Sequence, residues 1–170
     1  MNQADDEPPP GRGGGRPALS PELLRKPSLW LSDRPTSVTV RGISMEPFLK
    51  DEAVIEVVTT TRDRVAEGQL LVFERAGELV VHRLLQARAD KLLEKGDAQS
   101  LGNWLSWPDA LGVVSAVTRG EERVQLDEPP WPEALRRTAA RHLRRHRVHR
   151  AAQRLPGASL RRVFLWLARR

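Results

Sequence analysis

Short apolar, β-branched runs separated by turn residues fill the middle of the chain, and this texture limits the fold more than any other feature. The runs cover residues 37–40, 53–58, 69–75, 78–85, 91–94, 110–117 and 123–126. Runs of this length, some with strict alternation of apolar and polar residues, indicate β-strands. Short strands joined by tight turns predict a mainly β, antiparallel, barrel-like domain.

The flanks of this region differ from it, and they set the domain boundaries. Residues 1–20 are rich in Pro, Gly and Arg with almost nothing to bury, which predicts a disordered tail. We place the β domain at 21–128. After the Pro-rich segment 129–132 the period becomes helical, so residues 129–170 are predicted to form an Arg-rich helical tail. A chain of 170 residues suffices for one domain with a core.

The positive charge of the chain is concentrated in this tail. The formal net charge is +6, yet residues 131–170 alone hold 12 arginines and one acid. An anionic partner is therefore expected only for the tail. We favour a solvated helix laid on the domain, and the alternative is peripheral contact of residues 133–170 with an anionic membrane. A nucleic-acid partner is disfavoured, because no reading motif or aromatic platform accompanies the arginines.

Other features exclude several classes of site and suggest a compartment. The chain has no cysteine, which excludes disulfides and thiolate metal sites. His142, His146 and His149 share helical spacing but have no carboxylate nearby, so no metal or other cofactor is predicted. No run approaches the roughly 20 apolar residues that span a bilayer, and the N-terminus does not read as a secretory signal. These features predict a cytoplasmic protein, with attachment at a membrane surface as the alternative.

Three polar residues stand at the ends of predicted β elements: Ser44, His82 and Asp97. A serine hydroxyl becomes a useful nucleophile when imidazole takes its proton and a carboxylate fixes the imidazole tautomer. Each residue also has an ordinary interpretation. Ser44 and Asp97 are common turn residues, and a histidine in a strand is usually half-buried and satisfied. The residue types alone therefore leave both interpretations open.

Four sequence blocks, in order, resemble type I signal peptidases and their relatives. They are Ser44-Met45-Glu46-Pro47 after a strand, the GQLLVFER segment at 68–75 before a hairpin, Lys95-Gly96-Asp97, and a closing strand that begins at Leu111-Gly112. The resemblance covers about residues 36–120. It implies a small signal peptidase/LexA-type catalytic domain.

The resemblance also implies roles for individual residues. His82 stands where one branch of the family, which includes the endoplasmic-reticulum enzymes, carries its general base. Asp97 would then orient the base, and Asp109 is the reserve candidate for that role. Met45 is expected to line the substrate groove. Gly42 stands where some members have a serine that lends a hydroxyl to the oxyanion, and the Ser44 amide would be an oxyanion donor.

The implied function is a serine endopeptidase that cleaves a leader or precursor peptide after small residues. One alternative is a LexA-like self-cleaving regulator, which expects a lysine base and a scissile Ala-Gly ahead of the serine, whereas Ala76-Gly77 lies after it. Another is a non-catalytic relative that binds peptides or membranes. The chain departs from the family pattern in turns, with Asp51-Glu52 and Gly68-Gln69 where Gly-Asp is usual.

Overall fold

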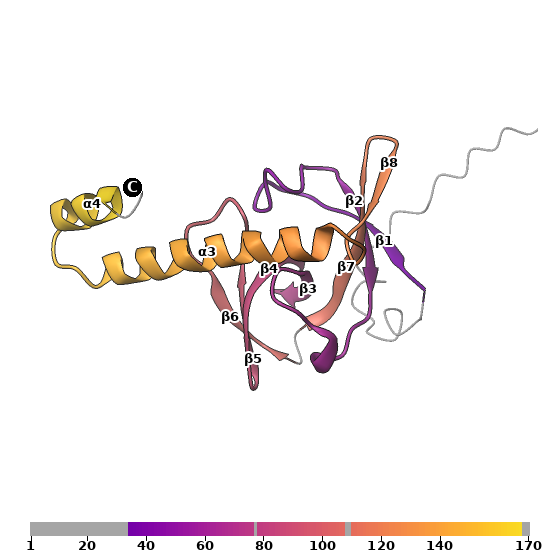
Figure 1. The fold of residues 1–170 in the computed structure, drawn as a ribbon, viewed down its shortest axis with the longest axis horizontal. Helices are drawn as coiled ribbons and strands as arrows, with labels where there is room; N and C mark the ends of the chain where they lie inside the picture. Colours follow the sequence, from indigo (N-terminus) through magenta and orange to yellow (C-terminus); the bar gives the residue numbers. More distant parts are fainter. Residues whose placement is uncertain (1–33, 77, 108–109, 168–170) are drawn as a thin grey trace, which may run out of the picture.

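The computed structural model describes residues 34–76, 78–107 and 110–167 (Figure 1). In chain order the elements are β1 (Thr36–Thr39), β2 (Val54–Val58), the 3-10 turn η1 (Arg62–Arg64), β3 (Leu70–Arg75), β4 (Glu78–Arg88), β5 (Lys91–Lys95), β6 (Asn103–Ser106), β7 (Ala110–Arg119), β8 (Glu122–Gln125), α3 (Trp131–Gln153) and α4 (Ala158–Leu167). The predicted disordered tail at 1–20 and residues 21–33, the start of the predicted β domain, lie outside the described residues.

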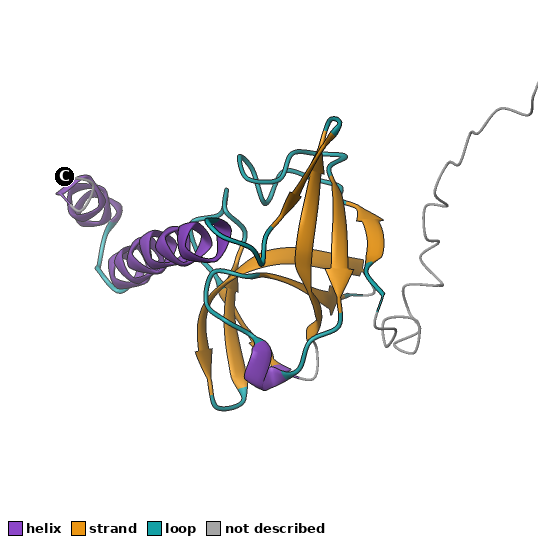
Figure 2. Cartoon of the chain, turned by 45° about the vertical axis from the view of Figure 1, so that its right-hand side comes forward, coloured by secondary structure: helices purple, strands orange, loops and turns teal. Residues whose placement is uncertain are grey.

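The described strands form one antiparallel sheet in the order β1-β2-β7-β3-β4-β5-β6, and β8 pairs with β7. The mainly β, antiparallel prediction is confirmed. The barrel-like prediction is wrong, because β1 and β6 end the sheet and no pairing between these described strands closes it. Figure 2 shows the strands curling without closure, with the two C-terminal helices to one side.

The curl of the sheet buries both faces of its central strand. Register shifts interrupt the pairing of β2 with β7, of β3 with β7 and of β4 with β5. Such bulges bend a sheet and increase its twist. In β3, Leu70 and Val72 pack in one core cluster, whereas Leu71 and Phe73 pack in another. A strand covered on both sides loses the alternation of apolar and polar residues, which explains the continuous apolar run LLVF.

The first part of helix α3 packs across the sheet, and its C-terminal part extends beyond the strands toward α4 (Figure 1). Leu135 joins the main core cluster, and Ala139 packs with Leu85 and Leu93. The start of the helix crosses the chain at Gly68, where a Cβ would lie 2.6 Å from the carbonyl carbon of Leu135. The first part of the helix therefore packs against the β domain through Leu135 and Ala139.

Two details of the elements were not predicted from the sequence. Strand β6 was missed, since its sequence NWLS has one buried residue and little alternation of apolar with polar side chains. Strand β4 extends to Arg88, three residues beyond the predicted run. Within the described part of the chain, no helix is both long and apolar enough to cross a membrane.

Candidate active site

The turn between β1 and β2 presents Ser44 at the edge of the core. The Glu46 amide donates to the Ile43 carbonyl (3.1 Å), and the Leu49 amide donates to the Met45 carbonyl (3.0 Å). Met45 and Leu49 are each 1% exposed and pack in the main core cluster. These two buried side chains hold the turn in place. Ser44, which precedes them in the chain after β1, is half-buried.

His82 on β4 lies against this serine. Its Nε2 is 3.2 Å from Ser44 Oγ, within reach of a hydrogen bond between a nucleophile and its base. The ring is 3% exposed, and it makes an edge contact with Phe73 at 5.9 Å between centroids. Packing against Phe73 restricts rotation of the imidazole, so the Nε2 atom stays directed at the hydroxyl.

A buried carboxylate completes the line of polar groups, and it belongs to Glu94 on β5. One oxygen of Glu94 pairs with His82 Nδ1, and the other accepts a hydrogen bond from Arg75 at 2.6 Å. An ionised carboxylate only accepts, so Nδ1 carries the proton in this pair. Nε2 is then the acceptor for the Ser44 hydroxyl, as a general base requires.

The environment of Glu94 keeps its carboxyl ionised. Burial alone would raise the pKa of this group, because the interior disfavours charge. Hydrogen bonds with His82 and then Arg75 outweigh burial, and the net pKa of Glu94 lies below its ordinary value. The carboxylate is therefore negative at neutral pH and can stabilise an imidazolium on His82.

Strand register explains why Glu94 meets His82. Leu84 pairs with Glu94, and Arg83 pairs with Lys95. Successive side chains in a strand point to opposite faces, so His82, Leu84 and Glu94 share one face, and Arg83 and Lys95 share the other. The sequence carried a signal for this site, a lone carboxylate after two apolar residues, but not the register that brings it to the histidine.

The structure does not bring Asp97 to His82. Asp97 instead forms a two-pronged ion pair with Arg83, at 2.8 and 2.6 Å, on the opposite face of β4. Glu94 therefore occupies the orienting position that the resemblance gave to Asp97. Asp109, the reserve candidate, lies outside the described residues.

The two predicted substrate contacts differ in exposure. The Met45 side chain is buried in the main core cluster, so it anchors the nucleophile turn to the core and does not line an open groove. Gly42 is exposed and has φ +95°, a conformation that side-chain-bearing residues rarely adopt. The Gly42 amide donates to Asp51 Oδ1 at 2.8 Å. Asp51 therefore fixes the backbone two residues before Ser44.

The residues after β5 form the wall beside the nucleophile. The Ala98 amide donates to the Ser44 carbonyl at 2.9 Å. A Cβ on Gly96 would lie 2.6 Å from that carbonyl oxygen and 3.1 Å from His82 Nε2. No described residue accepts a hydrogen bond from the Ser44 amide, which leaves this N–H as a donor for a bound oxyanion.

Two of the three histidines of α3, His142 and His146, contact Lys95 and Gly102 beside the sheet. His146 Nδ1 accepts from the Gly102 amide at 3.0 Å, and His142 Nδ1 lies 3.0 Å from Lys95 Nζ. Among the described residues, no three His, Asp or Glu side chains gather as metal ligands would. The residues from Ser44 to Glu94 form the arrangement that could support catalysis: a hydroxyl, a base and an anion in series.

Comparison with the models of protein families found no match. Comparisons with curated proteins and with solved structures likewise found no significant match. The function is therefore inferred from the geometry of the site and from the motifs in the sequence.

Proposed function

We propose that this chain is a serine endopeptidase of the signal peptidase-like type, with Ser44 as nucleophile, His82 as general base and Glu94 as the orienting carboxylate. One observation carries the proposal: Ser44 Oγ, both ring nitrogens of His82 and the Glu94 carboxylate form one hydrogen-bonded series. Such a series is recognised by its geometry on unrelated folds, whatever the order of its members in the chain.

The chemistry follows from these atoms. His82 Nε2 takes the Ser44 proton as Oγ bonds to the peptide carbonyl carbon, and Glu94 stabilises the imidazolium. The Ser44 amide donates to the oxyanion, a type of contact whose loss typically costs about 10²–10³ in turnover. Nε2 then protonates the leaving amine as the C–N bond breaks. Water, deprotonated by the same imidazole, hydrolyses the acyl ester and regenerates the hydroxyl.

The free edge of β4 supports a peptide as the substrate. Residues 78–83 of β4 pair with β3 on one side, and β5 pairs only from Arg83 onward. Within the described sheet, the other edge of 78–82 has no strand partner, and it ends at His82. An extended peptide can add to such an edge through main-chain hydrogen bonds. The family resemblance favours a leader or precursor peptide with small residues before the cleaved bond.

A serine-directed phosphonate tests the proposal directly. We expect the wild-type protein to gain one adduct, located on Ser44 by peptide mass spectrometry, and Ser44→Ala to gain none. Ser106→Ala is the matched control, because Ser106 is exposed on β6. Its labelling should equal that of the wild type. An unlabelled wild type, or labelling that persists in Ser44→Ala, would overturn the proposal and leave a non-catalytic binding protein.

Incubation of the purified chain separates this proposal from the self-cleaving alternative. A peptidase that acts on other chains keeps its intact mass over days. Cleavage of the chain itself, seen as a decrease in intact mass that disappears in Ser44→Ala, would instead support a LexA-like regulator.

A further inference from the structure

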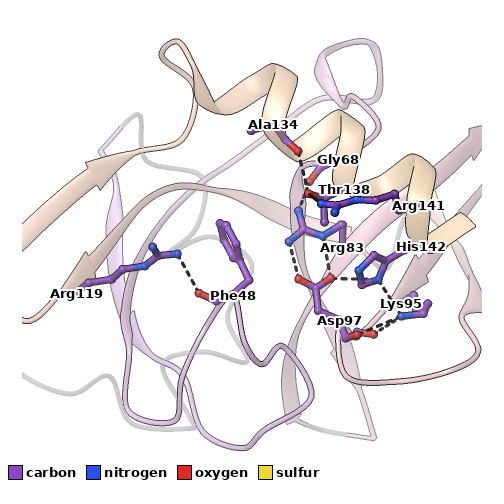
Figure 3. Close-up of polar contacts among 11 residues, drawn as sticks. Phe48, Gly68, Arg83, Lys95, Asp97, Arg119, Ala134, Thr138, Arg141 and His142 are labelled. Carbon is purple, nitrogen blue, oxygen red and sulfur yellow. Dashed lines mark hydrogen bonds and ion pairs between the residues drawn. The ribbon is translucent and has the colours of Figure 1, made fainter.

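A second buried polar cluster lies behind the candidate active site, between the sheet and α3 (Figure 3). It consists of Arg83, Lys95, Asp97 and His142. Arg83 and Lys95 are 0% and 1% exposed, although both carry long cationic side chains. Burying charge is unfavourable unless each group is paired, so the contacts within this cluster have to be specific.

Asp97 and the backbone satisfy the cations of the cluster. Arg83 donates twice to the Asp97 carboxylate and once to the Gly68 carbonyl at 3.0 Å. Lys95 Nζ donates to the Gly96 carbonyl at 2.8 Å and lies 3.4 Å from the Asp97 carbonyl. Both cations therefore hold the turn that begins at Gly96.

His142 brings α3 into this cluster. Its Nδ1 lies 3.0 Å from Lys95 Nζ and 3.6 Å from Asp97 Oδ1. Lysine only donates, so Nδ1 is an acceptor and the ring is neutral. Burial, followed by the Lys95 charge, lowers the pKa of His142 to about 4, in agreement with a neutral ring. The contact with Lys95 is thus the hydrogen bond, and Asp97 is a more distant neighbour.

The same turn contacts the candidate nucleophile on its other side. Ala98 donates its amide to the Ser44 carbonyl at 2.9 Å, and Gly96 packs so closely that a Cβ would crowd Ser44 and His82. A continuous series of contacts therefore runs from His142 through Lys95 and the 96–98 turn to the serine. Lys95 and Gly96 in this series are buried, and the Ala98 amide is hydrogen-bonded.

We propose that α3 is a positioning element of the active site, in which His142 holds Lys95 and the 96–98 turn against Ser44 and His82. This inference rests on the proposed function for its catalytic consequence, while its structural part stands on the contacts alone. His142 touches neither the serine nor a substrate, so it is a positioning residue and not a catalytic one.

A neighbouring histidine offers a matched control. His146 lies one turn along α3, is 9% exposed, and accepts a hydrogen bond from Gly102. It attaches the same helix to the same sheet without touching the 96–98 turn. If α3 acts only through global stability, His142→Leu and His146→Leu should have the same consequences.

Two measurements on the full chain distinguish these cases: hydrogen exchange of the Ala98 amide by NMR, and the rate of phosphonate labelling at Ser44. For His142→Leu we expect exchange about tenfold faster. Labelling should slow by up to about 10²-fold, the scale of a small misplacement of reacting groups. His146→Leu should stay within about twofold of the wild type in both. His142→Gln, whose side-chain oxygen can accept from Lys95, should recover much of the loss.

Equal effects of His142→Leu and His146→Leu, or an unchanged Ala98 amide in His142→Leu, would overturn the inference. If His142→Leu does not fold by circular dichroism, His142→Ala serves in its place against His146→Ala. An unlabelled wild type would overturn the proposed function alone, because the exchange measurement needs no activity and still decides the positioning.

Discussion

Glu94 is the residue that most changes the interpretation of this site. A carboxylate that is 0% exposed has to be paired, and here its partners are the histidine and Arg75. Both hydrogen bonds lower the pKa of Glu94 against the effect of burial. The consequence is a fixed anion behind His82, which is what a base needs while it carries a proton.

Replacing Glu94 by Gln should therefore remove most of the reactivity and leave the fold intact. An amide no longer stabilises the imidazolium, and it can donate to Nδ1 and so place the proton on Nε2. Substitutions of this kind in a triad cost about 10⁴ in turnover. We expect Glu94→Gln to slow phosphonate labelling of Ser44 by about 10²-fold or more.

The control for this substitution is Glu56→Gln. Glu56 is also a buried carboxylate paired with an arginine, Arg123, at 2.8 Å, but it lies on β2 away from His82. Its loss tests the effect of removing such a pair without touching the base. Equal labelling rates in the two variants would show that Glu94 has no special role.

Gly96 is the second position where a single atom decides the site. An added Cβ would lie 2.6 Å from the backbone oxygen of Ser44, and a backbone atom cannot rotate away as a flexible side chain can. We expect Gly96→Ala to displace the nucleophile turn. Phosphonate labelling of Ser44 should then slow by about tenfold or more, as misplaced reacting groups do. Gly120→Ala is the control: Gly120 lies in the turn between β7 and β8 and no atom lies within 4 Å of its Cβ position, so the strain from its φ of +62° stays local to that turn. Normal labelling in Gly96→Ala would contradict the packing described here.

Helix α3 depends on few apolar contacts for an element of its length. Its buried residues are Leu135, Ala139, His146 and Ala152. Two histidines supply hydrogen bonds to the sheet where a wider apolar face would otherwise be needed. A helix attached through neutral imidazoles should be sensitive to acid.

The pH dependence of stability follows from the direction of these shifts. The pKa of His142 is lowered from 6.5 to about 4 by burial and by Lys95, with Asp97 opposing and Arg83 and Arg145 adding to the decrease. Burial lowers the pKa of His146 as well. The folded chain then binds fewer protons than the unfolded chain between these pH values. The contribution of the neutral histidines to the free energy of unfolding is fully present above about pH 6.5 and declines as the pH falls towards 4.

Urea unfolding at about pH 7 and about pH 4.5 measures this effect. We expect His142 to account for a decrease on the order of 2 kcal/mol in the free energy of unfolding between the two conditions. In His142→Gln that part of the decrease should vanish. A wild-type slope in His142→Gln would contradict a neutral His142 in the fold.

The charges of the whole molecule are divided between two regions. Residues 131–170 carry 12 arginines against one acid, although the net charge of the chain is only +6. Helix α4 adds apolar surface to this cationic region, with Leu160 57% exposed and Arg161 and Arg162 exposed beside it. Cationic and apolar groups together suit the surface of an anionic bilayer.

Vesicle sedimentation tests this partner. On the membrane-contact alternative, the protein should bind vesicles that contain phosphatidylserine, be released as salt is raised, and not bind vesicles of phosphatidylcholine alone. Arg161→Glu should weaken binding, while Lys91→Glu, the same charge change at the exposed first residue of β5, should not. Absence of binding to either lipid, or equal effects of the two substitutions, would favour a solvated helix.

Much of the fold was predictable because strand character is a local property. Alternation and β-branched residues marked seven of the eight strands, and the change of period near residue 130 marked α3. Strand β6 escaped because its sequence NWLS has a single buried position. Closure of the sheet was wrongly predicted, since the number of strands does not determine whether the end strands meet.

For the candidate site, too, some residues could be predicted from local sequence and others could not. Ser44 and His82 were predicted from the resemblance of their segments to signal peptidases, because each of these resemblances lies within a single stretch of the chain. The choice of acid was not, because Glu94 and Asp97 are three residues apart and both suit the role chemically. Pairing of β4 with β5 places Glu94 on the face of the imidazole and leaves Asp97 to Arg83. Local periodicity records which way a side chain faces, whereas a hydrogen bond depends on which strand lies beside it and in what register, and those are set only when the chain folds.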